Sequence, residues 1–147
     1  MTPFWDKAVA DWVDMRLEHA GPFPHDTCQA MGVEHKGATV AGFVFHNYDP
    51  DAGVIEVSGA SDHPRWATKT VVREAMDYVF RVAGCQMLYA RQHIDNIAAR
   101  RGWLHLGATE HIIPRLFGRG TTGTLLFLTA EQLSLIHISE PTRLRRI

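Results

Sequence analysis

The sequence predicts a mixed α/β domain, and three observations lead to this prediction. With 147 residues, of which 46% are hydrophobic and 21% charged, the chain has the size and composition of a globular protein with one sizeable core. Segments with helical and strand periodicity follow one another in the order helix, strands, helix, strand, helix, strands. No repeat, linker or low-complexity segment indicates a second domain. We therefore expect a single domain of α/β (mixed α+β) class.

The first predicted element is an amphipathic helix near the N-terminus. Thr2 and Pro3 supply an N-cap and a first-turn proline. Apolar residues then recur at helical spacing, at Trp5, Val9, Trp12, Val13 and Leu17. Gly21 and Pro22 end the pattern.

Three strands are predicted next. They cover residues 29–35, 39–47 and 54–59. A short Gly-containing segment at 36–38 predicts a hairpin, and residues 49–53 predict a second turn. In the third strand apolar and polar residues alternate, which is typical of a half-buried strand.

The segment between Asp62 and Gly84 has the strongest helical pattern in the chain. One face is apolar and is formed by Val72, Ala75, Met76, Val79 and either Val82 or Ala83. Charged residues, such as Arg73 and Asp77, occupy the other positions. The pattern predicts a helix that buries this apolar face and ends at Gly84.

The last third of the chain predicts a strand, a helix and two further strands. Residues 85–91 form a short apolar run, and Asp95 is the predicted cap of a helix that extends through Leu104. Gly107 marks a turn into residues 109–117, and the final strand covers residues 124–129.

Charge and composition exclude several classes of function. The formal net charge of −1 provides no broad attraction to nucleic acid or to an anionic membrane. No apolar run approaches the roughly 18 residues of a membrane-spanning helix, and the N-terminus lacks the pattern of a secretory signal. Cys28 and Cys85 form no CxxC pair, and the nine histidines show no compact metal-ligand spacing. We expect a cytoplasmic protein that binds no metal, nucleic acid or membrane.

The C-terminal segment differs from the rest of the chain. Residues 133–147 read LSLIHISEPTRLRRI and share no periodicity with the preceding strand. Residues 133–143 resemble the translation of a transposase-type sequencing adapter, and a natural basic tail is the alternative. We therefore treat residues 1–132 as the domain and residues 133–147 as a non-native tail.

Most of the chain, residues 39–132, resembles the GNAT acyltransferase family, and the specific part of the resemblance is in the second half. Residues 54–61 look like the central strand of that family, and RWATKT at 65–70 looks like its pyrophosphate loop. NIAA at 96–99, followed by LG at 106–107, looks like its NxxA helix motif. Residues 115–132 resemble the final hairpin of ribosomal-protein-type and phage-encoded members. The resemblance implies a central mixed, mostly antiparallel sheet flanked by helices.

The resemblance also implies acetyl-CoA as co-substrate. Its binding residues would be Gly59, Ala60, Ser61, Arg65, Trp66, Ala67, Thr68, Lys69, Thr70 and Asn96. The physical reason is that a strand, a turn and a helix start leave unpaired N–H groups aimed at one spot, which binds phosphate. Arg65 and Lys69 add positive charge for a diphosphate. Alternatively, these two residues are only solvated, and Asn96 only caps its helix.

Three residues depart from the family pattern. Thr68 and Thr70 stand where the loop usually has small residues, glycine above all, and threonine narrows the site. Trp103 stands where many relatives have a tyrosine that protonates the departing thiolate. Because an indole cannot release a proton at physiological pH, His105, Tyr89 or water would have to serve.

Two residues are candidates for the general base. Glu56 lies on the strand before the loop, on the same face as a glutamate that is frequent in the family, and His46 is at the end of the neighbouring β-run. Either could take a proton from a substrate ammonium group. The alternative for both is an outward-facing polar position on a strand.

These observations predict transfer of an acetyl group from acetyl-CoA to a primary amine by direct attack in a ternary complex. The amine would belong to a small molecule or to a protein N-terminus or lysine. A non-catalytic GNAT-like binding or assembly module, possibly phage-related, is the main alternative, and another α/β ligand-binding domain is a third. The sequence leaves the acceptor and the oligomeric state open.

Overall fold

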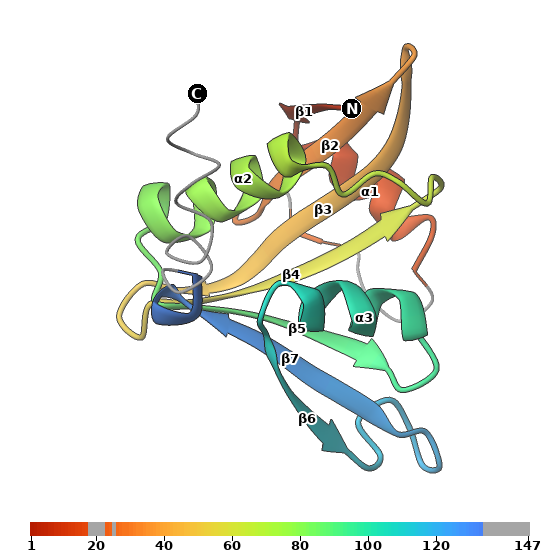
Figure 1. The fold of residues 1–147 in the computed structure, drawn as a ribbon, viewed down its shortest axis with the longest axis vertical. Coiled ribbons are helices and arrows are strands. Elements are labelled where there is room, and N and C mark those ends of the chain that lie inside the picture. The colour runs from red at the N-terminus through yellow and green to blue at the C-terminus, as the bar shows by residue number, and fades with distance from the viewer. Residues whose placement is uncertain (18–22, 25, 134–147) are drawn as a thin grey trace. The chain divides into compact units, whose positions relative to one another are not determined.

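The computed structural model describes residues 1–17, 23–24 and 26–133 (Figure 1). The chain divides into two compact units, Met1–Cys85 and Gln86–Ile147. Strands and helices occur in both units, so the mixed α+β class is confirmed. Apart from Leu133, the predicted tail lies outside the described residues. In the part of the chain that the structure describes, no helix has the length and hydropathy needed to cross a membrane.

The first unit contains an antiparallel sheet of four strands. In spatial order they are β1 (Thr2–Trp5), β2 (Gln29–His35), β3 (Ala38–Asp49) and β4 (Val54–Ser61). The predicted hairpin is confirmed, with Lys36 and Gly37 at positive φ in the turn. The second turn is also confirmed, and Gly53 at φ 71° ends it.

The predicted N-terminal helix is wrong over its first turn. Residues Thr2–Trp5 form a strand that pairs with β2, so Thr2 is not an N-cap. Helix α1 covers only Val9–Asp14. The Asp6 side chain accepts a hydrogen bond of 2.9 Å from the Ala8 amide before this helix. Pairing with a distant strand therefore overrides the local helical spacing.

The second helix starts later than predicted and changes its winding. Helix α2 covers Lys69–Asp77 with Thr68 as N-cap, so the first residues of the predicted segment between Asp62 and Gly84 are not helical. A π-helix, η1 (Tyr78–Val82), continues it, and Gly84 at φ 69° follows. A π turn rotates the residues after it out of the 3.6-residue pattern. Val82 is consequently 60% exposed, and it does not lie on the apolar face.

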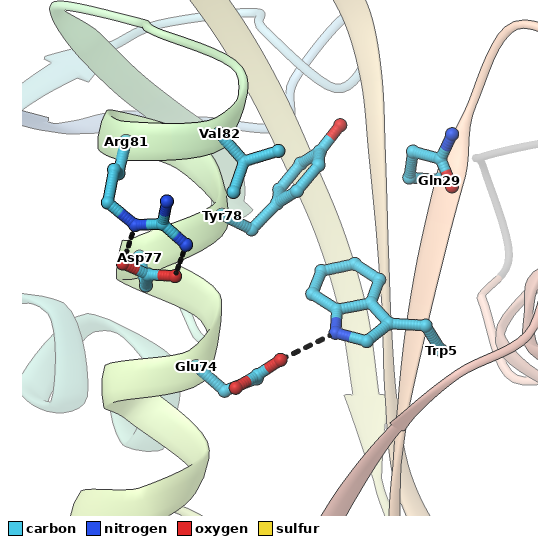
Figure 2. Close-up of a pocket in the computed structure, with 7 residues that line it drawn as sticks. All are labelled: Trp5, Gln29, Glu74, Asp77, Tyr78, Arg81 and Val82. Carbon is cyan, nitrogen blue, oxygen red and sulfur yellow. Dashed lines mark hydrogen bonds and ion pairs between the residues drawn. The ribbon is translucent and has the colours of Figure 1, made fainter.

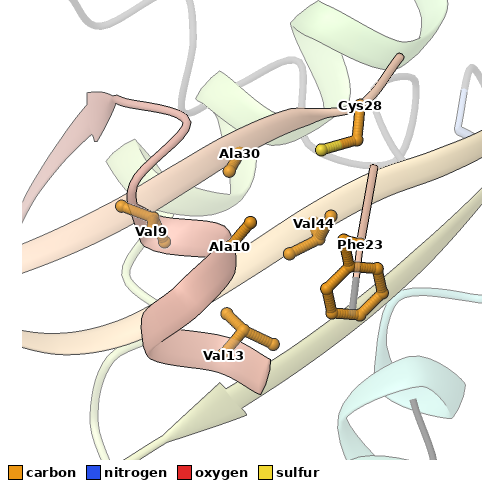
Figure 3. Packing of buried hydrophobic residues seen from close by; sticks show 7 residues of the cluster. All are labelled: Val9, Ala10, Val13, Phe23, Cys28, Ala30 and Val44. Carbon is orange, nitrogen blue, oxygen red and sulfur yellow. The ribbon is translucent and has the colours of Figure 1, made fainter. Parts of the chain in front are cut away.

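The two faces of the four-stranded sheet have different cores. Odd-numbered residues of β3 face α2, where aromatic rings gather. The ring centroids of Phe45 and Tyr78 are 5.2 Å apart. Those of Trp5 and Tyr78, both drawn in Figure 2, are 4.9 Å apart. Even-numbered residues of β3 face α1 and build an aliphatic core. Figure 3 shows this cluster, which consists of Val9, Ala10, Val13, Phe23, Cys28, Ala30 and Val44.

The second unit contains a three-stranded antiparallel sheet and one α-helix. Its elements are β5 (Met87–His93), α3 (Ile97–His105), β6 (Thr109–Ile113) and β7 (Gly123–Thr129), and β7 lies between β5 and β6. Asn96, and not Asp95, caps α3. Within the unit, Arg100 and Glu110 form an ion pair of 2.7 Å.

Candidate active site

The loop between β4 and α2 exposes the residues predicted to bind the diphosphate. Arg65 and Lys69 are exposed, and Trp66 packs its ring against Phe43, with the centroids 4.6 Å apart. His63 Nδ1 accepts a hydrogen bond of 3.0 Å from the Arg65 amide. The loop is thus anchored by an aromatic contact while its cationic side chains reach solvent.

Unpaired amides are present where α2 begins. In the described part of the chain, the N–H groups of Ala67, Lys69 and Thr70 donate to no acceptor. The first amides of a helix carry the positive end of its dipole, so they favour an anionic group. The loop is therefore suited to a phosphate. It offers the backbone amides of Lys69 and Thr70, the ammonium group of Lys69 and the guanidinium group of Arg65.

Thr68 uses its hydroxyl as a helix cap. Its Oγ1 accepts a hydrogen bond of 3.4 Å from the Val71 amide, and its own amide donates to the Trp66 carbonyl at 2.9 Å. A phosphate would find the Val71 amide already partnered. Thr68, which stands in place of a small residue, therefore leaves one backbone amide fewer to bind the phosphate.

Helix α1 is tied to this loop by an arginine. Arg16 donates from Nη2 to Asp62 Oδ2 at 2.8 Å and from Nε to Oδ1 at 3.1 Å. Its guanidinium lies 3.5 Å above the Trp12 ring. The hydrogen bond from Arg16 lowers the pKa of the Asp62 carboxyl. The start of the loop is thus fixed to α1, on the face that carries the base candidates.

The two candidate bases are direct cross-strand partners. His46 on β3 pairs with Glu56 on β4, so their side chains lie on the same face as α1. Glu56 is only 2% exposed, which contradicts an outward-facing position, and His46 is half-buried beside Phe23 with 5.0 Å between ring centroids. The sheet therefore brings together two residues that are ten positions apart in the sequence.

Two further side chains join this pair, and sequence reasoning did not assign them a role. The hydroxyl of Ser58 lies 2.8 Å from His46 Nε2. The amide of Asn47 donates to Glu56 Oε1 at 2.8 Å. Ser58 could have been found from the alternation of β4, since it shares the face of Glu56. Asn47 could not, because a register shift after His46 and a φ of 52° turn it toward Glu56.

Gly59, Ala60 and Ser61 pair with Phe43, Gly42 and Ala41 of β3. A Cβ at Gly59 would lie 2.4 Å from the Phe43 ring, so glycine is required here for packing.

The remaining candidates belong to the second unit. Asn96 Oδ1 accepts from the Ala99 amide at 3.3 Å, and its Nδ2 donates to Gln92 at 3.0 Å. It therefore acts as a helix cap. Trp103 is half-buried in α3, His105 ends that helix, and Tyr89 lies on β5. The described residues of the chain contain no cluster of histidine, cysteine and acidic side chains that could hold a metal ion.

Comparison with known proteins identifies the fold. No family model and no curated protein matches the sequence. Among solved structures, mutant forms of the spermidine/spermine N-acetyltransferase SpeG from Vibrio cholerae match with a TM-score of 0.72 at 11% identity, over 90% of this chain and 97% of that one. A complex of Mycobacterium smegmatis RimJ with CoA-disulfide matches with a TM-score of 0.62 at 18% identity, over 74% of this chain.

A probable acetyltransferase matches with a TM-score of 0.61 at 14% identity, over 72% of this chain. The chain spans 63% of that protein and 56% of RimJ. At these identities the comparison establishes the fold. It is the GNAT acetyltransferase fold, as the sequence motifs predict.

Proposed function

We propose that the chain is an N-acetyltransferase that moves the acetyl group of acetyl-CoA to a primary amine by direct attack in a ternary complex. One observation carries the proposal beyond the fold. Glu56 is buried opposite His46, and the strand that carries it leads into a loop with unpaired amides and exposed cationic side chains. A base and an anion-binding loop on one strand–loop–helix segment are what this reaction requires.

The reaction needs one proton removed from the acceptor. An amine arrives as an ammonium ion, and Glu56 or His46 takes its proton, so that the nitrogen lone pair is free to attack. A nitrogen–carbon bond forms at the thioester carbonyl, the carbon–sulfur bond breaks, and coenzyme A leaves as its thiol after protonation. Backbone amides at Gly59, Ala60 and Ser61 would polarise the carbonyl.

The diphosphate of the co-substrate would be held by the loop between β4 and α2. The diphosphate would bind the amides of Lys69 and Thr70, with Arg65 and the Lys69 side chain as counter-charges and Trp66 as a wall. Ala67 and Thr68 complete the loop. Asn96, which the resemblance assigns to the pantetheine arm, serves as the cap of α3 within the second unit. The acceptor would be a small amine or a protein N-terminus or lysine, and the nearest subgroup would be the ribosomal-protein-type and phage-encoded members.

A non-catalytic binding module is the second candidate, and two observations favour it. The hydroxyl of Thr68 occupies the Val71 amide, which weakens the phosphate site. Trp103 stands where the resemblance places a proton donor. Such a module would bind acetyl-CoA without turning it over.

Binding and turnover distinguish these candidates. Calorimetry with acetyl-CoA at low salt tests the loop, and Lys69→Glu should weaken binding by about tenfold because it places negative charge against the phosphates. Arg73→Glu is the matched control, since it makes the same charge change one turn further along α2 and should weaken binding less. Equal affinity of Lys69→Glu and the wild type would refute the loop as the site.

Turnover is measured over a panel of small amines, polyamines, aminoglycosides and peptides. Acetylation of any of these amines supports the enzyme. Binding of acetyl-CoA without acetylation, also in Trp103→Tyr, would replace the enzyme with the binding module. Absence of binding would contradict both.

A further inference from the structure

A pocket of about 410 Å³ lies in the first unit, on the α2 face of the sheet (Figure 2). Trp5 of β1 and Gln29 of β2 form one side. The other side comes from the end of α2 and from η1, with Glu74, Asp77, Tyr78, Arg81 and Val82. The pocket contains none of the residues assigned to the acetyl transfer.

Part of the pocket wall is apolar, and the Trp5 ring in it is held by a hydrogen bond. The Trp5 ring is 37% exposed, and it lies 4.9 Å from the ring of Tyr78. Its Nε1 donates to Glu74 Oε2 at 2.8 Å, which fixes the ring orientation. Val82 adds an aliphatic surface that is 60% exposed. A partly exposed indole that is held in a fixed orientation is a suitable partner for a cation.

The charges that line the pocket are negative on balance. Asp77 and Arg81 form a bidentate pair, with distances of 2.6 and 2.9 Å, and this pairing lowers the pKa of the Asp77 carboxyl. Arg81 therefore compensates Asp77. Glu74 contributes one further negative charge, and within the described residues its second oxygen accepts no hydrogen bond. A cation is attracted to this arrangement, whereas an anion would meet two carboxylates and only one guanidinium.

The π-helix is a separate observation that points to the same place. Tyr78, Arg81 and Val82 all lie on η1. π turns are rare, and they occur frequently at functional sites. Regular α winding would rotate Val82 away from its present exposed position, so the π turn shapes this wall.

We propose that this pocket binds an organic cation, specifically an alkylammonium group with a short hydrocarbon body. The ammonium group lies over the Trp5 ring and against the second oxygen of Glu74, and the hydrocarbon part contacts Tyr78 and Val82. The pocket is independent of acetyl transfer and would exist equally in a non-catalytic module.

Choline is a suitable probe because its quaternary nitrogen cannot be acetylated. The reporter is the Trp5 indole N–H resonance in ¹H–¹⁵N spectra of the full chain, assigned from its absence in Trp5→Phe. Choline should shift this resonance saturably, and its neutral isostere 3,3-dimethylbutan-1-ol should bind at least about threefold more weakly, the scale of a cation–π contact at an exposed site.

Two matched variants complete the test. Glu74→Gln should weaken choline binding, measured by calorimetry, by about threefold or more. Glu34→Gln makes the same change on the opposite end of β2 and should bind choline like the wild type. The proposal is overturned if the alcohol binds as tightly as choline, if the Trp5 resonance does not move, or if Glu74→Gln and Glu34→Gln bind choline equally.

Discussion

Each unit of the molecule contains a glutamate on a strand whose side chain is largely covered, and the two are held in different ways. Glu110 on β6 accepts two hydrogen bonds from Arg100, at 2.7 and 3.2 Å, and a third from the Thr124 hydroxyl at 3.0 Å. Glu56 on β4 accepts from the neutral amide of Asn47 and faces His46 across the sheet.

The difference indicates different roles. A carboxylate that is paired with a guanidinium is held in its charged form, and the hydrogen bond from Arg100 lowers the pKa of Glu110. Such a group cannot accept a proton near neutral pH, so its contribution is structural. Glu56 instead lies opposite His46, the other candidate for the general base, and this placement motivates its assignment to proton transfer. We therefore expect Glu56 to matter for activity and Glu110 for stability.

The largest expected effect is on turnover. Glu56→Gln should lower acetyl transfer by a factor of about 10², the scale of general base loss, while acetyl-CoA affinity stays nearly unchanged. Glu110→Gln makes the same chemical change in the other unit and should leave the turnover of the folded protein unchanged. Steady-state kinetics and calorimetry on both variants measure this. If the loss appears instead in His46→Gln and not in Glu56→Gln, the histidine is the base.

The second prediction concerns stability and pH. Glu110→Gln should lower the melting temperature by several degrees at pH 7, because the amide cannot pair with Arg100 as a charge. Since the folded pKa of Glu110 is lowered from its ordinary 4.5, its stabilisation is complete above that value and is lost as the pH falls through the folded pKa.

Melting curves between pH 7 and pH 3 check this. The difference between wild type and Glu110→Gln should shrink as the pH falls. A difference that is constant over this range would show that packing, and not charge, holds Glu110.

A smaller effect is expected at Ser58. Its hydroxyl shares a hydrogen bond of 2.8 Å with His46 Nε2, so Ser58 contacts a ring nitrogen at which His46 would gain or lose a proton. Ser58→Ala should lower turnover by about fivefold, the scale of one hydrogen bond, and should move the pH at half-maximal turnover. Ser58→Thr keeps the hydroxyl and should restore the wild-type profile. An unchanged pH profile in Ser58→Ala would separate Ser58 from proton transfer.

The smallest effect is expected from truncation after Gln132. The side chain of Gln132 donates to the Gly107 carbonyl and to Thr109 Oγ1, both at 3.0 Å, and it stays in the shortened chain. Calorimetric melting should change by no more than about 3 °C, the scale of a surface change. A larger loss would show that residues 133–147 pack on the domain, whatever their genetic origin, and would contradict the prediction that the fold does not need them.

Much of the fold and part of the site could be predicted from the sequence. Local backbone preferences determine the hairpin of β2 and β3, the turn before β4 and the end of the second helix. These preferences can be read from the sequence, because glycine stands at the turn positions Gly37, Gly53 and Gly84. The pairing of His46 with Glu56 does not follow from the turn at 49–53, because continuing the Asp49–Val54 pair would place His46 opposite Val57. The residues that resemble GNAT motifs, at 54–61, 65–70 and 96–107, predict the fold that the structure has.

Other features required the tertiary structure. Thr2–Trp5 has helical spacing but forms a strand, because β2 offers backbone partners that lie almost thirty residues away. The burial of Glu56 and the approach of Asn47 depend on a register shift. The exposure of Val82 depends on a π turn.

The sequence by itself determined the class of fold, the turns, and the strand–loop–helix segment that could hold a phosphate. Only the tertiary structure decided which polar residues are covered and which partners they have. The physical reason is that turns and caps depend on a few neighbouring residues, whereas strand pairing and burial are cooperative and depend on segments that are distant in the chain.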